Sequence, residues 1–143
     1  MNVAAILKAK GRAVATARPD ATLLEISRKL AAKKIGAIVI IGDKGEVAGI
    51  ISERDIIRNI AERGEAALST PVSEAMTRNV VTCQETSTLD DLMQTMTQGR
   101  FRHIPVVEDD ALVGIVSIGD VVKLHIAEVE MEVEAMRGYL ATG

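Results

Sequence analysis

Apolar and polar positions alternate along the chain in a pattern that occurs twice. In each half a short apolar stretch (residues 14–16 and 80–82) predicts a strand, and an amphipathic segment follows it. The apolar residues of that segment recur every three or four positions, which predicts a helix with one buried face. These residues are Leu23, Ile26 and Leu30 in the first half and Leu89, Leu92, Met93 and Met96 in the second.

Two short apolar runs follow each predicted helix and indicate a β-hairpin. They read AIVII and VAGII around GDKG in the first half, and IPVV and LVGIV around EDDA in the second. Pro105 has no backbone N–H, so its strand is expected to have a free edge there or to break early. A second helix is expected to start at Ser52 or Ser117. The predicted order is strand, helix, strand, strand, helix, twice.

The two halves are copies of one sequence unit. Thr16 aligns with Thr82 at an offset of 66 positions, and Gly49 aligns with Gly114 after one turn has shortened by a residue. A unit of about sixty residues leaves one face of a three-stranded sheet uncovered, and such a sheet is marginal alone. We therefore expect the two units to pack face to face and to form two equivalent clefts.

The repeat divides the chain into three parts. Residues 1–66 are expected to form the first unit with a short N-terminal helix, 67–78 a connector, and 79–143 the second unit. The end of the second unit is too long for its last helix alone. Apolar residues there step by four and three, which is typical of a helix that packs on another helix: Val122, Ile126, Val129, Val133, Met136 and Leu140. We expect a C-terminal dimerisation helix and a homodimer; the alternative is packing on the chain's own domain or on the N-terminal VAAIL helix.

Composition narrows the class of protein. The 143 residues are 48% hydrophobic but only 1% aromatic, which indicates a modest aliphatic core. A net charge of −3, without a basic run, makes nucleic acid an unlikely partner. No apolar run approaches the roughly 18 to 20 residues that cross a bilayer, and no signal peptide is evident, so a cytoplasmic location is expected. The single cysteine, Cys83, is expected to be a buried thiol, and no metal site is expected.

A Ser-x-x-Asp motif opens the second helix of each half, as Ser52 with Asp55 and as Ser117 with Asp120. The simplest interpretation is a capping box, and the first helix of each half begins with a similar motif. Both serines, however, directly follow an apolar strand, so the helix N-terminus faces outward beyond the strand end. Its hydroxyl and amides suit a phosphate, and the carboxylate suits two ribose hydroxyls. The motif therefore predicts a nucleotide.

Positive charge is distributed unequally between the halves. Arg100, Arg102 and His103 precede a strand of the second half, whereas the first half has Arg54 inside its motif. These side chains fit a phosphate, and the alternatives are solvated surface arginines and a structural histidine. An enzyme is not expected, because Cys83 and His103 have no evident orienting carboxylate and the chain has no phosphate-binding loop.

The tandem T-x-x-x-x-(A/S)-T-L, RHIPVV and S-x-x-D motifs resemble a cystathionine-β-synthase-type (CBS) domain pair, a Bateman module, over residues 14–123. The resemblance implies an α/β (α+β) fold of two β-α-β-β-α units packed pseudo-symmetrically through their sheets. It implies a regulatory module for energy sensing that binds AMP, ADP or ATP and acts on an unknown effector protein. The alternatives are an NAD(H)-type dinucleotide or S-adenosylmethionine sensor, and a ligand-free dimeric scaffold.

The resemblance also implies two sets of ligand contacts, with serine at the phosphate and aspartate at the ribose. The first cleft would use Thr16, Ala21, Gly36, Ala37, Ile38, Arg102, His103, Ile115, Ser117 and Asp120. The second would use Ser52, Arg54, Asp55, Thr82, Ser87 and Ile104, with Arg102 and His103 also facing it. Because Gly36 and Ala37 align with Arg102 and His103, the clefts are unequal, and the Asp120 cleft is expected to fill first.

Overall fold

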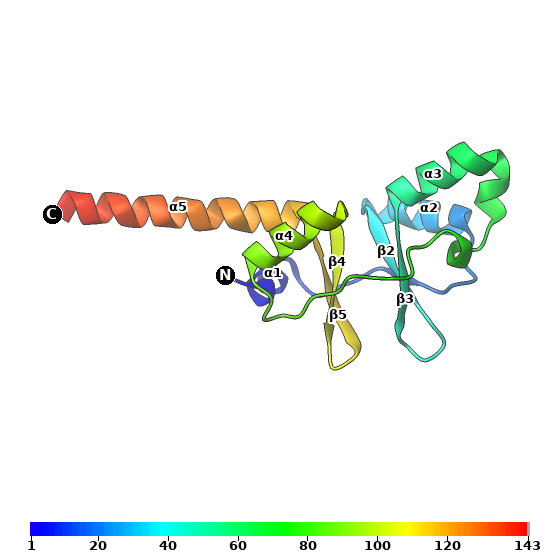
Figure 1. Cartoon of the computed structure of the whole chain (residues 1–143), viewed down its shortest axis with the longest axis horizontal. Helices are drawn as coiled ribbons and strands as arrows, with labels where there is room; N and C mark the ends of the chain where they lie inside the picture. The colour runs from blue at the N-terminus through cyan, green and yellow to red at the C-terminus, as the bar shows by residue number, and fades with distance from the viewer. Residues whose placement is uncertain (143) are drawn as a thin grey trace.

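Two units of similar shape lie side by side in the computed structural model, which describes residues 1–142 (Figure 1). The first unit contains β1 (Thr16–Ala17), α2 (Leu23–Lys33), β2 (Ala37–Ile41), β3 (Val47–Ser52) and α3 (Glu53–Arg63). The second contains α4 (Leu89–Gly99), β4 (His103–Glu108), β5 (Ala111–Ser117) and α5 (Ile118–Thr142). Helix α1 (Val3–Lys10) precedes them, and the 3-10 helices η1 (Gly64–Ser69) and η2 (Val72–Glu74) connect them. The predicted α+β class, helices and hairpins are confirmed.

A hydroxyl caps the start of each helix in the repeat, as the motifs predict. Thr22, Ser52, Thr88 and Ser117 each accept a hydrogen bond from the backbone N–H three residues later, at 3.1–3.3 Å. A cap of this kind satisfies one of the backbone donors that every helix start leaves free. Each change of direction from strand to helix is therefore fixed by local hydrogen bonds.

The sheets of the two units differ at one edge. In the first unit β2 pairs antiparallel with β3 and parallel with β1, and the N–H of Val39 donates to Ala15. The strand predicted at 80–82 is wrong for the described chain, because only a single bridge between Cys83 and Val106 occurs beside the β4–β5 hairpin. Pro105 occupies the place of Val39 in the repeat and has no N–H to donate. Strand β4 itself runs through Pro105 without a break.

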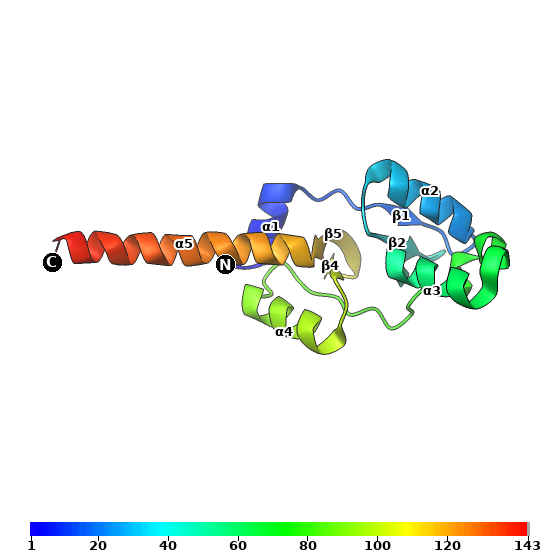
Figure 2. The ribbon, with the colours of Figure 1, turned by 90° about the horizontal axis from the view of Figure 1, so that it is seen from above.

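Each unit has its own hydrophobic core, and each core is completed by a segment from outside the repeat. The core of the first unit includes Ala67, Val72 and Met76 from the connector. The core of the second unit includes Val3 and Ile6 of α1, although α1 precedes the first unit in the sequence. Figure 2 shows α1 beside β5 and the first turns of α5. Residues 1–66 therefore contribute to both cores.

The two aligned glycines are explained by these added segments. A Cβ on Gly49 would lie 2.5 Å from Sδ of Met76, and a Cβ on Gly114 would lie 2.7 Å from Cδ2 of Leu7. A strand residue without a side chain is needed wherever another segment approaches the backbone this closely. Both units therefore have a glycine where an added segment packs closely on the strand.

Helix α5 extends well beyond the rest of the molecule (Figures 1 and 2). Its 25 residues correspond to a length of about 37 Å. Val121 is 2% exposed and joins the second core, whereas every residue from 130 to 142 is exposed. Within residues 1–142 no helix is both long enough and apolar enough to cross a membrane.

Candidate functional site

A cavity of about 320 Å³ lies where the two units meet, at the start of α3. We call it the inter-unit cavity. Its first-unit wall consists of Gly36, Ala37, Ile50, Ser52, Glu53, Arg54, Asp55 and Arg58. Thr77, Asn79 and Val81 line it from the connecting segment, and Gly99, Arg100, Phe101, Arg102 and His103 line it from the second unit.

The corner between β3 and α3 forms the polar floor of this cavity. Oδ2 of Asp55 accepts hydrogen bonds from the backbone N–H of Ser52 at 2.9 Å and from its hydroxyl at 3.0 Å. Oδ1 accepts from the guanidinium of Arg58 at 3.3 Å. The predicted capping box is present, and the same carboxylate lines the cavity. Each carboxylate oxygen can accept more than one hydrogen bond, so Asp55 retains capacity for a ligand.

His103 lies against the opposite unit, over Gly36. A Cβ on Gly36 would lie 3.2 Å from Cε1 of His103, so any larger residue there would press on the imidazole ring. Burial is the main cause of a lowered pKa for His103; Lys10 and Arg102 lower the pKa further, while Glu53 and Asp120 raise it. The net pKa is below its ordinary value of 6.5. At neutral pH the ring is therefore uncharged, with one donor and one acceptor nitrogen.

Positive charge dominates the lining of the inter-unit cavity. Four arginines line it, against the two carboxylates of Glu53 and Asp55. They come from both units: Arg54 and Arg58 from α3, and Arg100 and Arg102 from the segment between α4 and β4. Arginine forms forked hydrogen bonds with phosphate and carboxylate oxygens. The arrangement favours an anionic ligand that bridges the units.

The corner between β5 and α5 has a different chemistry. Oδ2 of Asp120 accepts from the N–H of Ser117 at 2.8 Å and from Nζ of Lys10 at 2.7 Å. Lys10 also donates to the carbonyl of Ile115 at 3.0 Å. Burial raises the pKa of Asp120, but the hydrogen bonds from Lys10 and Ser117 outweigh burial and leave the pKa below its ordinary value. An ammonium group thus binds the carboxylate that the sequence assigns to a ribose.

The structure brings together residues from both predicted sets. From the first set Gly36, Ala37, Arg102 and His103 line the inter-unit cavity, and from the second set Ser52, Arg54 and Asp55 do so. Residues of both sets meet because the register of the first hairpin pairs Ala37 in β2 with Ser52 at the end of β3. Ile115 and Asp120 instead accept hydrogen bonds from Lys10, and Ser117 donates its N–H to Asp120.

The other predicted contacts lie in the cores or on the surface. Ile38 and Ile104 are 0% exposed and belong to the two cores, and Ala21 packs against the first core. The carbonyl of Thr16 in β1 accepts a hydrogen bond from Lys29. Thr82 is exposed, and the hydroxyl of Ser87 accepts from the N–H of Gln84 at 3.0 Å.

Sequence reasoning missed two kinds of residue. Arg58 lies three residues after Asp55 on α3, so helical periodicity could have placed it beside that carboxylate. Lys10 could not have been found in this way, since nothing in the sequence shows that α1 packs on the second unit.

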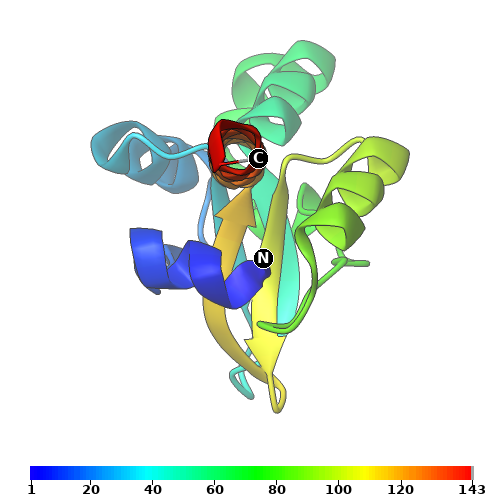
Figure 3. The same ribbon diagram turned by 90° about the vertical axis from the view of Figure 1, so that its left-hand side faces the viewer.

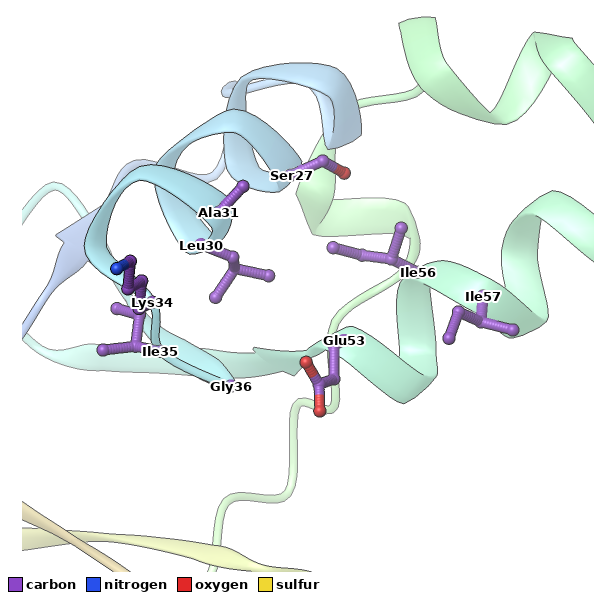
Figure 4. A pocket seen from close by; sticks show the side chains of 9 residues that line it. All are labelled: Ser27, Leu30, Ala31, Lys34, Ile35, Gly36, Glu53, Ile56 and Ile57. Carbon is purple, nitrogen blue, oxygen red and sulfur yellow. The ribbon is translucent and has the colours of Figure 1, made fainter.

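A second cavity, of about 550 Å³, lies between α2 and α3 (Figure 4). Apolar side chains dominate its lining: Leu30, Ala31, Ile35, Ile56 and Ile57, with Ser27, Lys34 and Glu53 at its edges. Nucleotide recognition requires several convergent polar groups. The inter-unit cavity provides them, and the α2–α3 cavity does not.

Comparison with known proteins decides the family. Residues 10–62 and 72–126 each match the family model of the CBS domain. The chain belongs to the CBS domain family. This CBS pair is 34% identical, over 96% of its length, to the CBS domain-containing protein CBSX3, mitochondrial, of Arabidopsis thaliana. The chain spans 71% of CBSX3, but only 21% of the longer CBSCBSPB5 of the same plant.

Solved CBS structures share the fold over nearly the whole chain. The CBS-domain containing protein ATU1752 from Agrobacterium tumefaciens is 52% identical, with a TM-score of 0.83 over 85% of this chain and 91% of its own. The protein PAE2072 from Pyrobaculum aerophilum, complexed with AMP, is 26% identical, with a TM-score of 0.75 and coverages of 84% and 89%. The CBS pair of MJ0100, in complex with 5-methylthioadenosine and S-adenosyl-L-methionine, is 28% identical, with a TM-score of 0.79 and coverages of 90% and 98%.

Proposed function

We propose that this CBS pair is a regulatory module that binds an adenine nucleotide, AMP, ADP or ATP, in the inter-unit cavity. The observation that carries the proposal is the meeting of the Ser52–Asp55 corner with arginines of both units around one cavity. A carboxylate beside several guanidinium groups suits a ribose attached to phosphate. The AMP bound to PAE2072, a protein of the same fold, supports this chemistry.

The charge of the cavity favours a nucleotide over S-adenosylmethionine, the ligand of MJ0100. S-Adenosylmethionine has two cationic groups, one carboxylate and no phosphate, so its net positive charge fits a cavity with four arginines less well than a phosphate does. A diphosphate or triphosphate would satisfy more of the guanidinium groups than AMP does. An NAD(H)-type dinucleotide has the phosphates but needs room for a second nucleoside.

The proposed contacts follow from the lining. Asp55 accepts hydrogen bonds from the ribose hydroxyls, and Arg54, Arg58, Arg100 and Arg102 bind the phosphates. The backbone of Gly36 and Ala37 faces the base. Ser117 and Asp120 form a second and weaker site, because a ribose there must first displace Lys10.

We propose that the output is a change in how the two units, and two copies of the chain, are arranged. The cavity walls come from both units, so a ligand that contacts both walls favours one arrangement by its difference in affinity. A separate effector protein would detect that arrangement. A homodimer is part of this proposal, because the apolar seam of α5 is exposed. The competing function is a dimeric scaffold that binds no nucleotide.

Isothermal calorimetry with AMP, ADP, ATP, NADH and S-adenosylmethionine tests the proposal. We expect affinity to rise with the number of phosphates and S-adenosylmethionine to bind weakest. Asp55→Asn should weaken the best nucleotide about tenfold to a hundredfold, since hydrogen bonds to a charged group contribute about 1.5 to 3 kcal/mol.

Asp91→Asn is the matched control, because Asp91 completes a capping box with Thr88 and does not line the inter-unit cavity. It should leave affinity unchanged. Absence of binding by every compound would favour the scaffold, and equal losses in the two variants would remove Asp55 from the site.

A further inference from the structure

We propose that α5 forms a parallel, in-register, two-stranded coiled coil with α5 of a second copy of this chain. The inference deepens the proposed homodimer by naming its contact surface and its orientation. Nucleotide binding in the inter-unit cavity does not depend on it, because no residue of α5 lines that cavity.

The seam of α5 does not pack on its own chain. The seam residues are 42–72% exposed: Val122, Ile126, Val129, Val133, Met136 and Leu140. The face of α5 that packs on the second unit is a different one and includes Val121 and Leu124. Figure 3 looks along α5 from its C-terminal end, and Figures 1 and 2 show that its outer part projects free of the body. Six exposed apolar side chains in one stripe require a partner surface.

The order of residue types in the seam favours a dimer. The spacing of four and three places Ile126, Val133 and Leu140 at the a positions of a heptad repeat, and Val129 and Met136 at the d positions. β-Branched residues at a positions combined with Leu at d positions favour two-stranded parallel coils, whereas β-branched residues at both positions favour higher oligomers. Ile126 and Val133 fulfil the first condition at the a positions, Val129 and Met136 replace Leu at the d positions, and the charges beside the seam then decide the pairing.

Charges beside the seam set the orientation. In a parallel coil each g position faces the e position five residues later in the partner. Glu132 at g then faces Arg137 at e with opposite charge, and Glu130 at e faces His125 and no like charge. In an antiparallel coil with Val133 packed on Val129, g positions face g positions and e positions face e positions, so Glu130 faces Arg137 but the two copies of Glu132 come together at the centre. The sequence of the flanks therefore selects the parallel arrangement.

A parallel arrangement also gives the short coil additional support. The seam covers only about two and a half heptads, which is marginal for an isolated helical pair. Parallel helices place both bodies at the same end, where Ile118, 42% exposed, begins α5. The bodies can then contact each other there, whereas an antiparallel coil would hold them at opposite ends.

The α2–α3 cavity of a second copy is the competing partner surface. It is apolar, and α2 carries Arg28, Lys29 and Lys33, which could attract the glutamates of α5 (Figure 4). In that case α5 would touch Ala31 and not another α5. The test below distinguishes the two arrangements.

Cysteine cross-linking of the full chain in a Cys83→Ser background tests the orientation. Ile126→Cys and Leu140→Cys lie near opposite ends of the seam. In a parallel, in-register coil each variant forms a disulfide with itself, because facing a positions lie within the Cα separation that a disulfide spans. A cross-link of Ile126→Cys that forms only with Met136→Cys would show an antiparallel coil, in which a positions face d positions. Cross-links of Val133→Cys only with Ala31→Cys would show the competing arrangement. Either result, or a monomer in sedimentation velocity, overturns the proposal.

Charge reversal provides an independent readout. Glu132→Arg or Arg137→Glu places like charges opposite each other twice per dimer, and each should weaken dimerisation about fivefold. The double variant Glu132→Arg with Arg137→Glu restores the attraction and should recover most of the loss. Glu134→Arg, at an outward b position, is the control with an equal change of charge. Equal weakening by the control, or no recovery in the double variant, would contradict the pairing. Calorimetry with ATP on the same variants keeps this outcome separate from the proposed nucleotide site.

Discussion

Lys10 and Asp120 lie 110 positions apart in the sequence and form an ion pair, with Nζ of Lys10 2.7 Å from Oδ2 of Asp120. The pair joins α1 to the corner between β5 and α5. At the equivalent corner of the first unit, Asp55 pairs with Arg58 of its own helix. The two copies of the Ser-x-x-Asp motif are thus chemically unequal, although their sequences match.

The first prediction is that Lys10→Met makes the Asp120 corner accessible to nucleotide. Without the ammonium group, a ribose no longer has to displace a partner from Asp120. Calorimetry should show stoichiometry rising from about one toward two nucleotides per chain. Lys8→Met, on the exposed part of the same helix, is the control. An unchanged stoichiometry would mean that Lys10 does not exclude ligand from this corner.

The second prediction concerns acid stability. The hydrogen bonds of Lys10 and Ser117 leave the pKa of Asp120 below the value of 3.8 expected for the unfolded chain. A lowered pKa stabilises the folded state fully above the unfolded pKa, and the contribution disappears as pH falls through the folded pKa. Urea unfolding at pH 5 and pH 3 should therefore show a smaller loss of stability in Lys10→Met than in the original protein. The ion pair is partly exposed, so its contribution at pH 7 is about 1 kcal/mol or less.

The third prediction links His103 to nucleotide affinity. Burial lowers the pKa of His103 below 6.5, so folding favours the neutral ring, and stability falls as pH drops below about 6.5. A bound phosphate favours the charged ring and raises that pKa. Nucleotide affinity should then increase between pH 7.5 and pH 6, and His103→Asn should remove most of the increase. Identical pH profiles in the two proteins would place the phosphates away from His103.

The fourth prediction compares the two aligned glycines. A Cβ on Gly49 would lie 2.9 Å from the carbonyl oxygen of Thr77, which is held by the N–H of Ile50 at 3.0 Å. The three atoms nearest to a Cβ on Gly114 all belong to the flexible side chain of Leu7. Gly49→Ala should cost about 1 to 3 kcal/mol, the range for overpacking, and Gly114→Ala should cost less. The free energies from urea unfolding would refute this if the order were reversed.

The fifth prediction is that Cys83 is unreactive in the folded protein. Burial, and then the charge of Glu108, raise the pKa of its thiol to about 11. At pH 8 only about one molecule in a thousand carries the reactive thiolate. Labelling with a thiol reagent should be slow in buffer and fast in denaturant. Rapid labelling of the folded protein would indicate that the strand bridge at Cys83 opens readily.

Local features of the fold could be predicted from the sequence, because local interactions determine them. The helix starts at Thr22, Ser52 and Thr88 follow from side chains that cap their own helices. The failed strand at 80–82 shows the limit of pattern reading. The apolar residues at 80–82 fit a strand, but Pro105 on the neighbouring strand has no backbone N–H to donate to it. Only the pairing register shows that this segment lies beside Pro105.

Part of the candidate site could be predicted from the sequence, because pairing within each hairpin places those residues. The register of the first hairpin pairs Ala37 with Ser52, and that of the second pairs His103 with Ser117, so each strand start lies beside a corner of its own unit. The resemblance placed Gly36 and Ala37 opposite Asp120, whereas the structure places them beside Asp55. Lys10 could not be predicted, because its position depends on long-range packing of α1.

The placement of α1 also affects how the chain folds during synthesis. The connector that completes the first core, through Val72, leaves the ribosome directly after the residues it covers. Val3 and Leu7 are made before the first unit, but Val116 and Val121 of the same core are made more than a hundred residues later. At typical elongation rates of about 5–20 residues per second, these apolar side chains lack Val116 and Val121 as packing partners for several seconds. The second unit therefore assembles after the first, around a helix that was made before either unit.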